Sequence, residues 1–253
     1  MLNSLFIQAI AVDWDQIAPG SYLRDIPAVA GLSRLEFERP VTFFVGENAT
    51  GKSTVLEAIA VASGFNAEGG TRNYRFSTWD DVSELGQALR LSRGPRQART
   101  GYFFRAESFF NVASKAAEYD RERGAPSFGD RGLHEQSHGE GFLSFFQTFR
   151  GAGLYLMDEP EAAISPQRQL TLLLHMKRLA QAGAQIIAVT HAPILLGLPG
   201  AQILSFDGGE IRPVAWEETE SYRITKLFLE KPERVFRLLE EEDAEEIPGK
   251  ERT

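Results

Sequence analysis

The spacing of apolar positions changes along the first 65 residues of the chain. Residues 4–12 and 32–46 are runs rich in β-branched and aromatic side chains, which is typical of strands. Residues 51–65 then follow helical spacing, with Val55 and Ile59 on one face. The pattern predicts two strands followed by a helix.

A similar alternation returns in the second half of the chain. Residues 153–160 are an apolar run that ends in acidic residues, which predicts a buried strand. Residues 165–183 indicate an amphipathic helix with a Ser-Pro start and a Gly stop. Residues 184–193 and 201–214 predict further strands, the second with a Gly-Gly hairpin turn.

Strands that alternate with helices at both ends of the chain predict an α/β fold with a mainly parallel sheet. We expect a single domain over residues 1–253. Residues 66–150 are less regular, and they predict an inserted, partly helical lobe. Residues 219–246 predict two C-terminal helices, and residues 242–253 predict a flexible acidic tail.

Composition narrows the class of protein. The chain is 43% hydrophobic and 25% charged, as is usual for a soluble globular protein, and its net charge of -8 disfavours non-specific nucleic-acid binding. The absence of Cys excludes disulfides and thiolate metal sites.

The N-terminal apolar run has no basic region before it, so we expect a strand and not a signal peptide. No apolar run reaches the length of about 18 residues that a membrane span needs, so a cytoplasmic location is expected.

Residues 46–53 carry the strongest local signal. They read GENATGKS and match the pattern G-x-x-x-x-G-K-[ST], between a predicted strand and a predicted helix. In this pattern consecutive backbone N–H groups form an anion nest, and the helix N-terminus adds partial positive charge. Lys52 would reach the β- and γ-phosphates of ATP, and Ser53 would ligate Mg²⁺. The expected nucleotide-binding residues are Gly46, Glu47, Asn48, Ala49, Thr50, Gly51, Lys52, Ser53 and Thr54.

Two other predicted strands end in polar residues. The run LYLMDEP ends in Asp158 and Glu159, and the run IIAVTHAP contains His191 just after its apolar part. Because ligands of α/β sheets bind at the carboxyl ends of strands, we expect these side chains beside the phosphates. Asp158 would hold Mg²⁺ directly or through water, and Glu159 would act as general base toward the attacking water. His191 would contact the γ-phosphate and that water, although a His at a strand end is often structural.

Together these segments resemble the ABC-type ATPases. GENATGKST is similar to the family's Walker A motif, LYLMDEP to its Walker B motif with the catalytic Glu, and IIAVTHAP to its switch-His strand. EQSHGEGF, residues 135–142, lies where the family has its signature loop. The resemblance covers about residues 30–210 and is nearest to the soluble branch with SMC-like and break-repair ATPases and small bacterial AAA family ATPases.

The resemblance implies a mixed-sheet core, a partly helical signature lobe and a homodimer. Two chains would close head to tail with ATP in the interface. Ser137 and Gly139 of one chain would contact the γ-phosphate bound by Lys52 of the other, with His138 and Glu140 in the same loop. Each complete site would then need two copies of the chain.

Three positions depart from the family's pattern. His138 replaces the first Gly of the signature, so it either contacts the nucleotide or weakens the loop. The Q-loop Gln is missing, and Arg105 or Glu107 takes its place; Glu107 is a candidate Mg²⁺ contact or part of a charged turn. Ser165 stands where the D-loop has an acidic residue, or it caps the helix that begins at Pro166.

Two further assignments stay open. Tyr22 or Trp14 could stack on the adenine, or could belong to the core. Residues 134–138 match the zinc-protease pattern H-E-x-x-H, with Glu159 available as a third ligand. Glycines close to this pattern disfavour the long helix that zinc ligation needs.

Three roles are compatible with such an ATPase. We favour a stand-alone ATP-switched dimer with an unidentified protein partner. A transporter's nucleotide-binding subunit is the second role, and the missing Q-loop Gln argues against it. An ATPase of DNA repair or defence is the third, since clustered arginines could track phosphates or could simply form a solvated face. These arginines are Arg72, Arg75, Arg90, Arg93, Arg96, Arg99 and Arg105.

Overall fold

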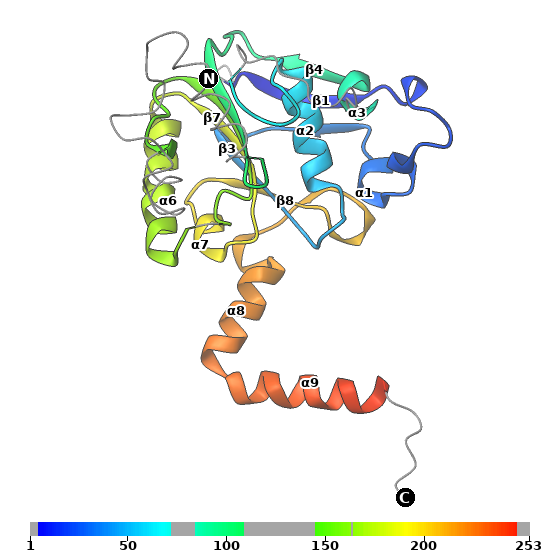
Figure 1. Cartoon of the computed structure of the whole chain (residues 1–253), viewed down its shortest axis with the longest axis vertical. Coiled ribbons are helices and arrows are strands. Elements are labelled where there is room, and N and C mark those ends of the chain that lie inside the picture. Colours follow the sequence, from blue (N-terminus) through cyan, green and yellow to red (C-terminus); the bar gives the residue numbers. More distant parts are fainter. Residues whose placement is uncertain (1–4, 72–83, 109–144, 163, 247–253) are drawn as a thin grey trace, which may run out of the picture.

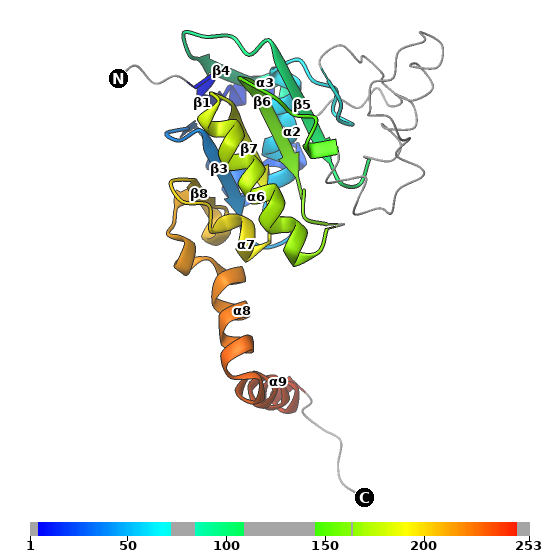
Figure 2. The same ribbon diagram turned by 90° about the vertical axis from the view of Figure 1, so that its left-hand side faces the viewer.

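The computed structural model describes residues 5–71, 84–108, 145–162 and 164–246. Two β-sheets and their helices form a body, and two C-terminal helices project from it (Figure 1). The same arrangement is seen from the side in Figure 2, where the first projecting helix begins beside the body and the second lies well away from the strands. The α/β class that the sequence predicts is confirmed.

The larger sheet has six strands within the described residues, in the order β5–β6–β7–β3–β8–β9. The first five pair in parallel, and β9 adds an antiparallel edge. The strands are β5 (Thr100–Arg105), β6 (Gly153–Asp158), β7 (Gln185–Val189), β3 (Val41–Val45), β8 (Gln202–Ser205) and β9 (Arg212–Pro213).

The register of this sheet brings strand ends to one level. Arg105 of β5 is paired with Asp158 of β6, Asp158 is paired with Val189 of β7, and Val189 is paired with Phe44 of β3. Because these strands are parallel, the segments that follow them all emerge at the same edge of the sheet. This edge carries the predicted chemistry.

A second, antiparallel sheet lies over the first. It contains β2 (Arg34–Glu36), β1 (Ile7–Val12) and β4 (Leu89–Arg93), in that order. The amide of Gln185, which is buried in β7, joins the two sheets. Its Nε2 donates to Ile7 O at 2.8 Å, and its Oε1 accepts from Ile7 N at 2.9 Å. These two bonds satisfy a polar side chain that would otherwise be costly to bury.

Helix α2 (Lys52–Ala62) packs in the apolar core between the two sheets, and α3 (Glu84–Ala88) lies against it. Side chains alternate across the large sheet, so that Phe44 joins this core while Phe43 joins the core on the other face. That other face is covered by α6 (Pro166–Gln181), α7 (Pro193–Leu196) and the aromatic residues Phe145, Phe146 and Phe149.

The predicted boundaries of the inserted lobe differ from the structure. Residues 84–105 form α3, β4 and β5, which belong to the two sheets and the core between them. The hydrophobic pattern does not reveal β4, because only one of its five residues is buried, as is usual for a half-solvated strand at the edge of an antiparallel sheet. Residues 109–144, which contain the predicted signature, lie outside the described part of the chain.

Short helical turns connect the larger elements. The segment before the phosphate loop contains η1 (Trp14–Gln16), η2 (Tyr22–Arg24) and α1 (Pro27–Ala30). The segment between β8 and the C-terminal helices contains η4 (Asp207–Gly209) and η5 (Trp216–Glu218).

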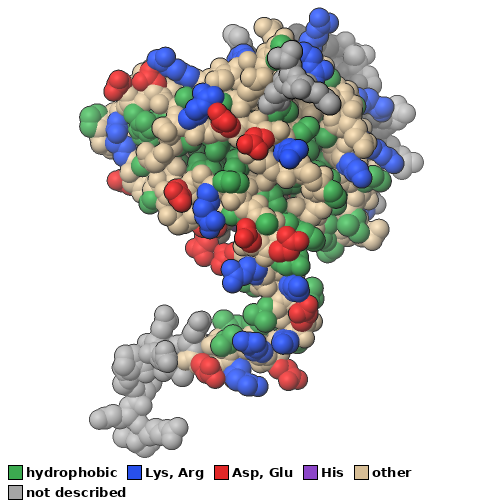
Figure 3. Space-filling view, turned by 180° about the vertical axis from the view of Figure 1, so that it is seen from behind, with side chains coloured by type: hydrophobic (Ala, Val, Ile, Leu, Met, Phe, Trp, Pro, Cys, Tyr) green, Lys and Arg blue, Asp and Glu red, His purple; other side chains and the backbone are tan. Residues whose placement is uncertain are grey.

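The C-terminal arm consists of α8 (Glu220–Glu230) and α9 (Pro232–Glu246). Lys231 between them has non-helical angles, and Pro232 opens α9 as a proline at a helix start is expected to do. Figure 3 shows hydrophobic side chains exposed among charged ones along this arm, and Leu229 is 75% exposed. Since α9 continues to Glu246, the predicted acidic tail begins inside a helix.

Among the described helices, none has both the length and the apolar character needed to cross a bilayer.

Candidate functional site

The segment GENATGKS connects β3 to α2, in the context that the motif requires. Gly46 has a φ of 136°, and a Cβ there would lie 2.7 Å from Oδ1 of Asp207. Gly51 has a φ of 92°, and a Cβ there would lie 2.4 Å from Cγ2 of Val29 in α1. Both glycines are therefore required by the backbone conformation and by the space around the loop.

Lys52 begins α2 and turns its ammonium group back into the loop. Its Nζ donates to Gly46 O at 2.8 Å, to Glu47 O, and more weakly to Thr50 Oγ1 at 3.5 Å. The side chain is buried, and this burial is the main cause that lowers the pKa of Lys52. Phosphate oxygens would be stronger acceptors for this ammonium than the neutral carbonyls it contacts.

Asp207, at the end of β8, supports the same loop and was missed by sequence reasoning. Its Oδ1 accepts from Glu47 N at 2.8 Å, and its Oδ2 accepts from Ser205 Oγ at 3.0 Å. Its charge also acts to raise the pKa of Lys52 against the effect of burial. The sequence pattern gives Asp207 no role, since it indicates only a Gly-Gly turn at the next two residues.

Ser53 and Asp158, both expected to hold Mg²⁺, have their side chains in contact, and the metal role itself stays a prediction. Ser53 Oγ donates to Asp158 Oδ1 at 2.9 Å, and Asp158 is buried, which raises the pKa of its carboxyl. Hydroxyl and carboxylate oxygens are ligands that Mg²⁺ accepts. Among the described residues, no group of three His, Cys, Asp or Glu gathers as a separate metal site. Two protein ligands beside a phosphate loop fit a Mg²⁺ ion that shares its coordination with phosphate and water.

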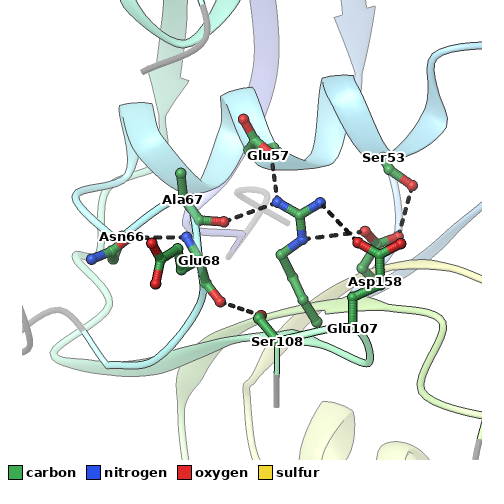
Figure 4. A network of polar contacts seen from close by, with 9 residues as sticks. Ser53, Glu57, Asn66, Ala67, Glu68, Glu107, Ser108 and Asp158 are labelled. Atoms are coloured by element: carbon green, nitrogen blue, oxygen red, sulfur yellow. Dashed lines mark hydrogen bonds and ion pairs between the residues drawn. The ribbon is translucent and has the colours of Figure 1, made fainter. Parts of the chain in front are cut away.

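Arg105 stands where the family's Q-loop Gln is expected, and it organises the polar network of Figure 4. Its guanidinium pairs with Glu57 Oε2 of α2 at 2.6 Å and donates to Ala67 O at 3.0 Å. The same group lies 3.7 Å from Asp158 Oδ2 and 4.0 Å from Glu107 Oε2. Arg105 thus supplies positive charge beside the predicted metal ligand. The Glu107 side chain is 90% exposed, and its Mg²⁺ contact stays a prediction.

Glu159 and His191 follow adjacent strands. Glu159 has a φ of 51°, in the left-handed region that costs a residue with a Cβ about 1–2 kcal/mol. Its N–H donates to Val189 O at 3.1 Å, which fixes the turn against β7. Both side chains are exposed at the carboxyl edge of the sheet. Their general-base and phosphate-contact roles stay predictions.

A second acidic residue of this turn, Glu161, was also missed. Its Oε1 accepts from Thr190 Oγ1 and from His191 N, both at 2.7 Å. Burial raises the pKa of the Glu161 carboxyl. The sequence offers one signal, an acidic residue two positions after the predicted general base, but nothing in the pattern indicates its partner.

A cavity of about 1500 Å³ opens beside the phosphate loop. Residues 45–50 form one wall, with His191 and residues 205–209 next to them. Residues 217–227, from η5 and α8, form another wall. The space next to the loop is therefore open to a ligand and is bounded by the first turns of the C-terminal arm.

The remaining predicted residues have different outcomes. Trp14 is packed on the core and its Nε1 donates to Leu32 O at 3.0 Å, so its place is structural. Tyr22 is 59% exposed and stays a candidate for adenine stacking. Ser165 does precede the helix at Pro166, but its side chain makes no cap hydrogen bond within the described residues. Other predicted residues lie outside the described part of the chain: Arg72, Arg75, the HEQSH segment, Ser137, His138, Gly139 and Glu140.

The loop between β3 and α2, with Asp158 beside Ser53, has the arrangement of a P-loop phosphate site. Comparisons with known proteins point in the same direction. A family model described as an AAA domain matches residues 22–111. The hemin import ATP-binding protein HmuV of Idiomarina loihiensis is 25% identical over 177 residues, which is 63% of this chain and 69% of that protein.

Two solved structures are also similar to the chain. One is cbiO1 from Clostridium perfringens, part of the ABC transporter complex cbiONQ, with 16% identity, a TM-score of 0.42, and coverage of 83% of this chain and 91% of that one. Another is an ATP-binding cassette of an ABC transporter, with 15% identity, a TM-score of 0.44, and coverage of 91% and 98%. The family match covers residues 22–111, which include the phosphate loop, and the curated relative is an ATP-binding protein; both are compatible with the resemblance to ABC-type P-loop ATPases.

Proposed function

We propose that this protein binds ATP with Mg²⁺ and hydrolyses it. The observation that carries the proposal is the convergence of three strand ends at one edge of the sheet. β3 leads to Lys52 and Ser53, β6 ends at Asp158 and is followed by Glu159, and β7 leads to His191. Each of these groups has a defined task in phosphoryl transfer to water.

In the proposed mechanism Lys52 binds the β- and γ-phosphates, together with the backbone N–H groups of the loop. Ser53 and Asp158 would hold Mg²⁺, which neutralises charge on the phosphates when it is bound. The carboxylate of Glu159 accepts a proton from the attacking water, and His191 orients that water against the γ-phosphate. The loop N–H groups and the Lys52 ammonium, already in place before reaction, would stabilise the charge that develops on the phosphate in the transition state.

The test of this function is Mg²⁺-dependent ATP turnover by the full chain, followed as phosphate release. Lys52→Ala should abolish both ATP binding and turnover, because the loop loses its cation. Glu36→Gln, in the remote strand β2, is a matched control that should leave both unchanged. Turnover by the Lys52→Ala variant at the wild-type rate would exclude this loop as the site.

We further propose that two copies enclose ATP head to tail, with Ser137 and Gly139 of one copy reaching the phosphate held by the other. Support for this arrangement comes from motif order alone. A mixture of Lys52→Ala and Ser137→Ala chains would contain mixed dimers with one intact site. Such a mixture should recover about a quarter of wild-type turnover if sites act independently and subunits exchange freely. A mixture as inactive as its components would contradict the dimer.

Two alternative roles have different support. Similarity to a hemin import ATP-binding protein favours a transporter subunit, and co-purification with a polytopic membrane protein would support it. For the DNA role, Arg105 is held in an internal network and Arg90 pairs with Asp13 at 2.5 Å, which leaves fewer arginines to track phosphates. Salt-dependent DNA binding that weakens on changing Arg93 and Arg96 would favour that role, and no binding at low salt would exclude it.

A further inference from the structure

The carboxylate of Glu161 is placed between two segments that carry the proposed catalytic residues. Glu161 lies two positions after Glu159, in the turn that leaves β6, where Ala162 N donates to Glu159 O at 3.1 Å. Its Oε1 accepts two hydrogen bonds of 2.7 Å, from Thr190 Oγ1 and from His191 N. Its Oε2 is buried and has no hydrogen-bond partner within the described residues.

We propose that Glu161 is a positioning residue that joins the Glu159 turn to the His191 turn, so that both proposed catalytic side chains keep one relative placement. This inference rests on the proposed ATPase function. Glu161 itself contacts neither ATP nor the attacking water. It acts through its hydrogen bonds to the backbone N–H of His191 and to the hydroxyl of Thr190.

Further bonds make the two turns one connected unit. Thr190 Oγ1 also accepts from Ala192 N at 3.1 Å, so the carboxylate, the hydroxyl and the start of α7 form a chain. Thr190 N donates to Phe44 O at 3.3 Å, in the strand that leads to the phosphate loop. Glu159 N donates to Val189 O at 3.1 Å. The Glu161 contacts thus add a side-chain connection next to an existing backbone connection.

The two hydrogen bonds that Oε1 accepts favour the ionised form of Glu161. Hydrogen bonds to a carboxylate are roughly twice as strong as neutral ones, and Oε1 receives two short bonds. Burial opposes the charge, and leaving a carboxylate oxygen without a partner is costly. A glutamine would keep one acceptor oxygen but lose the charge, while an alanine would leave Thr190 and His191 N without their acceptor.

The contacts predict which kinetic constants change. Glu161 touches the segment with His191, whereas the groups that hold phosphate, Lys52 and the loop, are fixed by Asp207 and by their own backbone. Loss of Glu161 should therefore lower kcat by about tenfold to a hundredfold, as expected for misplaced catalytic groups. The KM and the equilibrium Kd for Mg²⁺–ATP should change by no more than about twofold.

The experiment compares Glu161→Ala and Glu161→Gln with wild type and with the remote control Glu36→Gln. Turnover, ATP affinity and hydrogen exchange of the His191 amide are measured on each full-length protein. We expect kcat to decrease in the order wild type, Gln, Ala, and the His191 amide to exchange faster in the alanine variant before nucleotide is added. Thr190→Ser should keep kcat near wild type, and Thr190→Val should lower it, which tests the unit without touching Glu161.

Each outcome decides a different point. Unchanged kcat in Glu161→Ala, or an equal loss of ATP affinity and kcat, would overturn the positioning role. If Glu161→Ala fails to fold, the comparison of Thr190→Ser with Thr190→Val decides: equal kcat in both would overturn the role. If wild type itself does not hydrolyse ATP, the proposed function fails. Unchanged hydrogen exchange of the His191 amide in the Glu161 variants would separately overturn the positioning role of Glu161.

Discussion

Replacing Arg105 with alanine would remove the centre of the network in Figure 4. The guanidinium pairs with Glu57 at 2.6 Å, and the two side chains are 21% and 20% exposed, so water screens the pair only in part. Removing one partner of a fully buried pair costs about 3–5 kcal/mol, and an exposed pair contributes about 0.2–1 kcal/mol. With the lost bond to Ala67 O included, we expect Arg105→Ala to lower the free energy of unfolding by about 2–3 kcal/mol.

Urea unfolding of the full chain measures this loss. Arg34→Ala is the matched control, because Arg34 pairs with Glu36 at 3.0 Å while the two side chains are 55% and 63% exposed. The control should cost no more than about 1 kcal/mol, and added salt should reduce its effect further. Arg105→Lys should be less destabilised than Arg105→Ala, since it keeps the charge without the fork of donors. Equal losses for Arg105→Ala and Arg34→Ala would show that the Arg105 pair contributes no more than an exposed ion pair.

Two other predictions concern stability, and urea unfolding measures both. Gly51→Ala should cost about 1–3 kcal/mol more than Gly64→Ala, because both have positive φ but only Gly51 would place its Cβ against Val29; equal costs would contradict the contact. Burial raises the pKa of Glu161 in the folded state. Between the ordinary carboxyl pKa and the raised one, the folded protein therefore binds more protons than the unfolded chain. Wild-type stability consequently falls as pH rises through this window. Glu161→Gln should therefore gain stability relative to wild type across this window, and a constant difference with pH would contradict the assignment.

The parts of the fold that the sequence predicted are those with a clear period. The change from a fully buried strand to helical spacing around residue 50 located β3, the phosphate loop and α2. Likewise the continuous apolar runs of β6 and β7 are typical of strands buried on both faces, and the structure buries every residue of both. β4 was missed, because its partly exposed residues give neither period.

At the site, the sequence indicated residues that belong to motifs and missed residues that act through distant contacts. Lys52, Ser53 and Asp158 were expected together, and the Ser53 and Asp158 side chains do meet. Asp207 supports a loop 160 residues away in sequence, and Glu161 bonds to residues 29 and 30 positions away. Such pairings depend on sheet order, and no local pattern encodes which strands become neighbours.

The proposed ATP hydrolysis with Glu159 as general base is tested most directly by comparing phosphate release from Mg²⁺–ATP by wild type and by Glu159→Gln, with ATP affinity measured on both proteins. The variant should keep wild-type affinity and lose turnover by about 10²–10⁴-fold, because glutamine cannot accept the proton of the attacking water. Retained ATP should also strengthen dimerisation of the variant. Turnover by Glu159→Gln at the wild-type rate, with equal affinity, would show that Glu159 is not the general base.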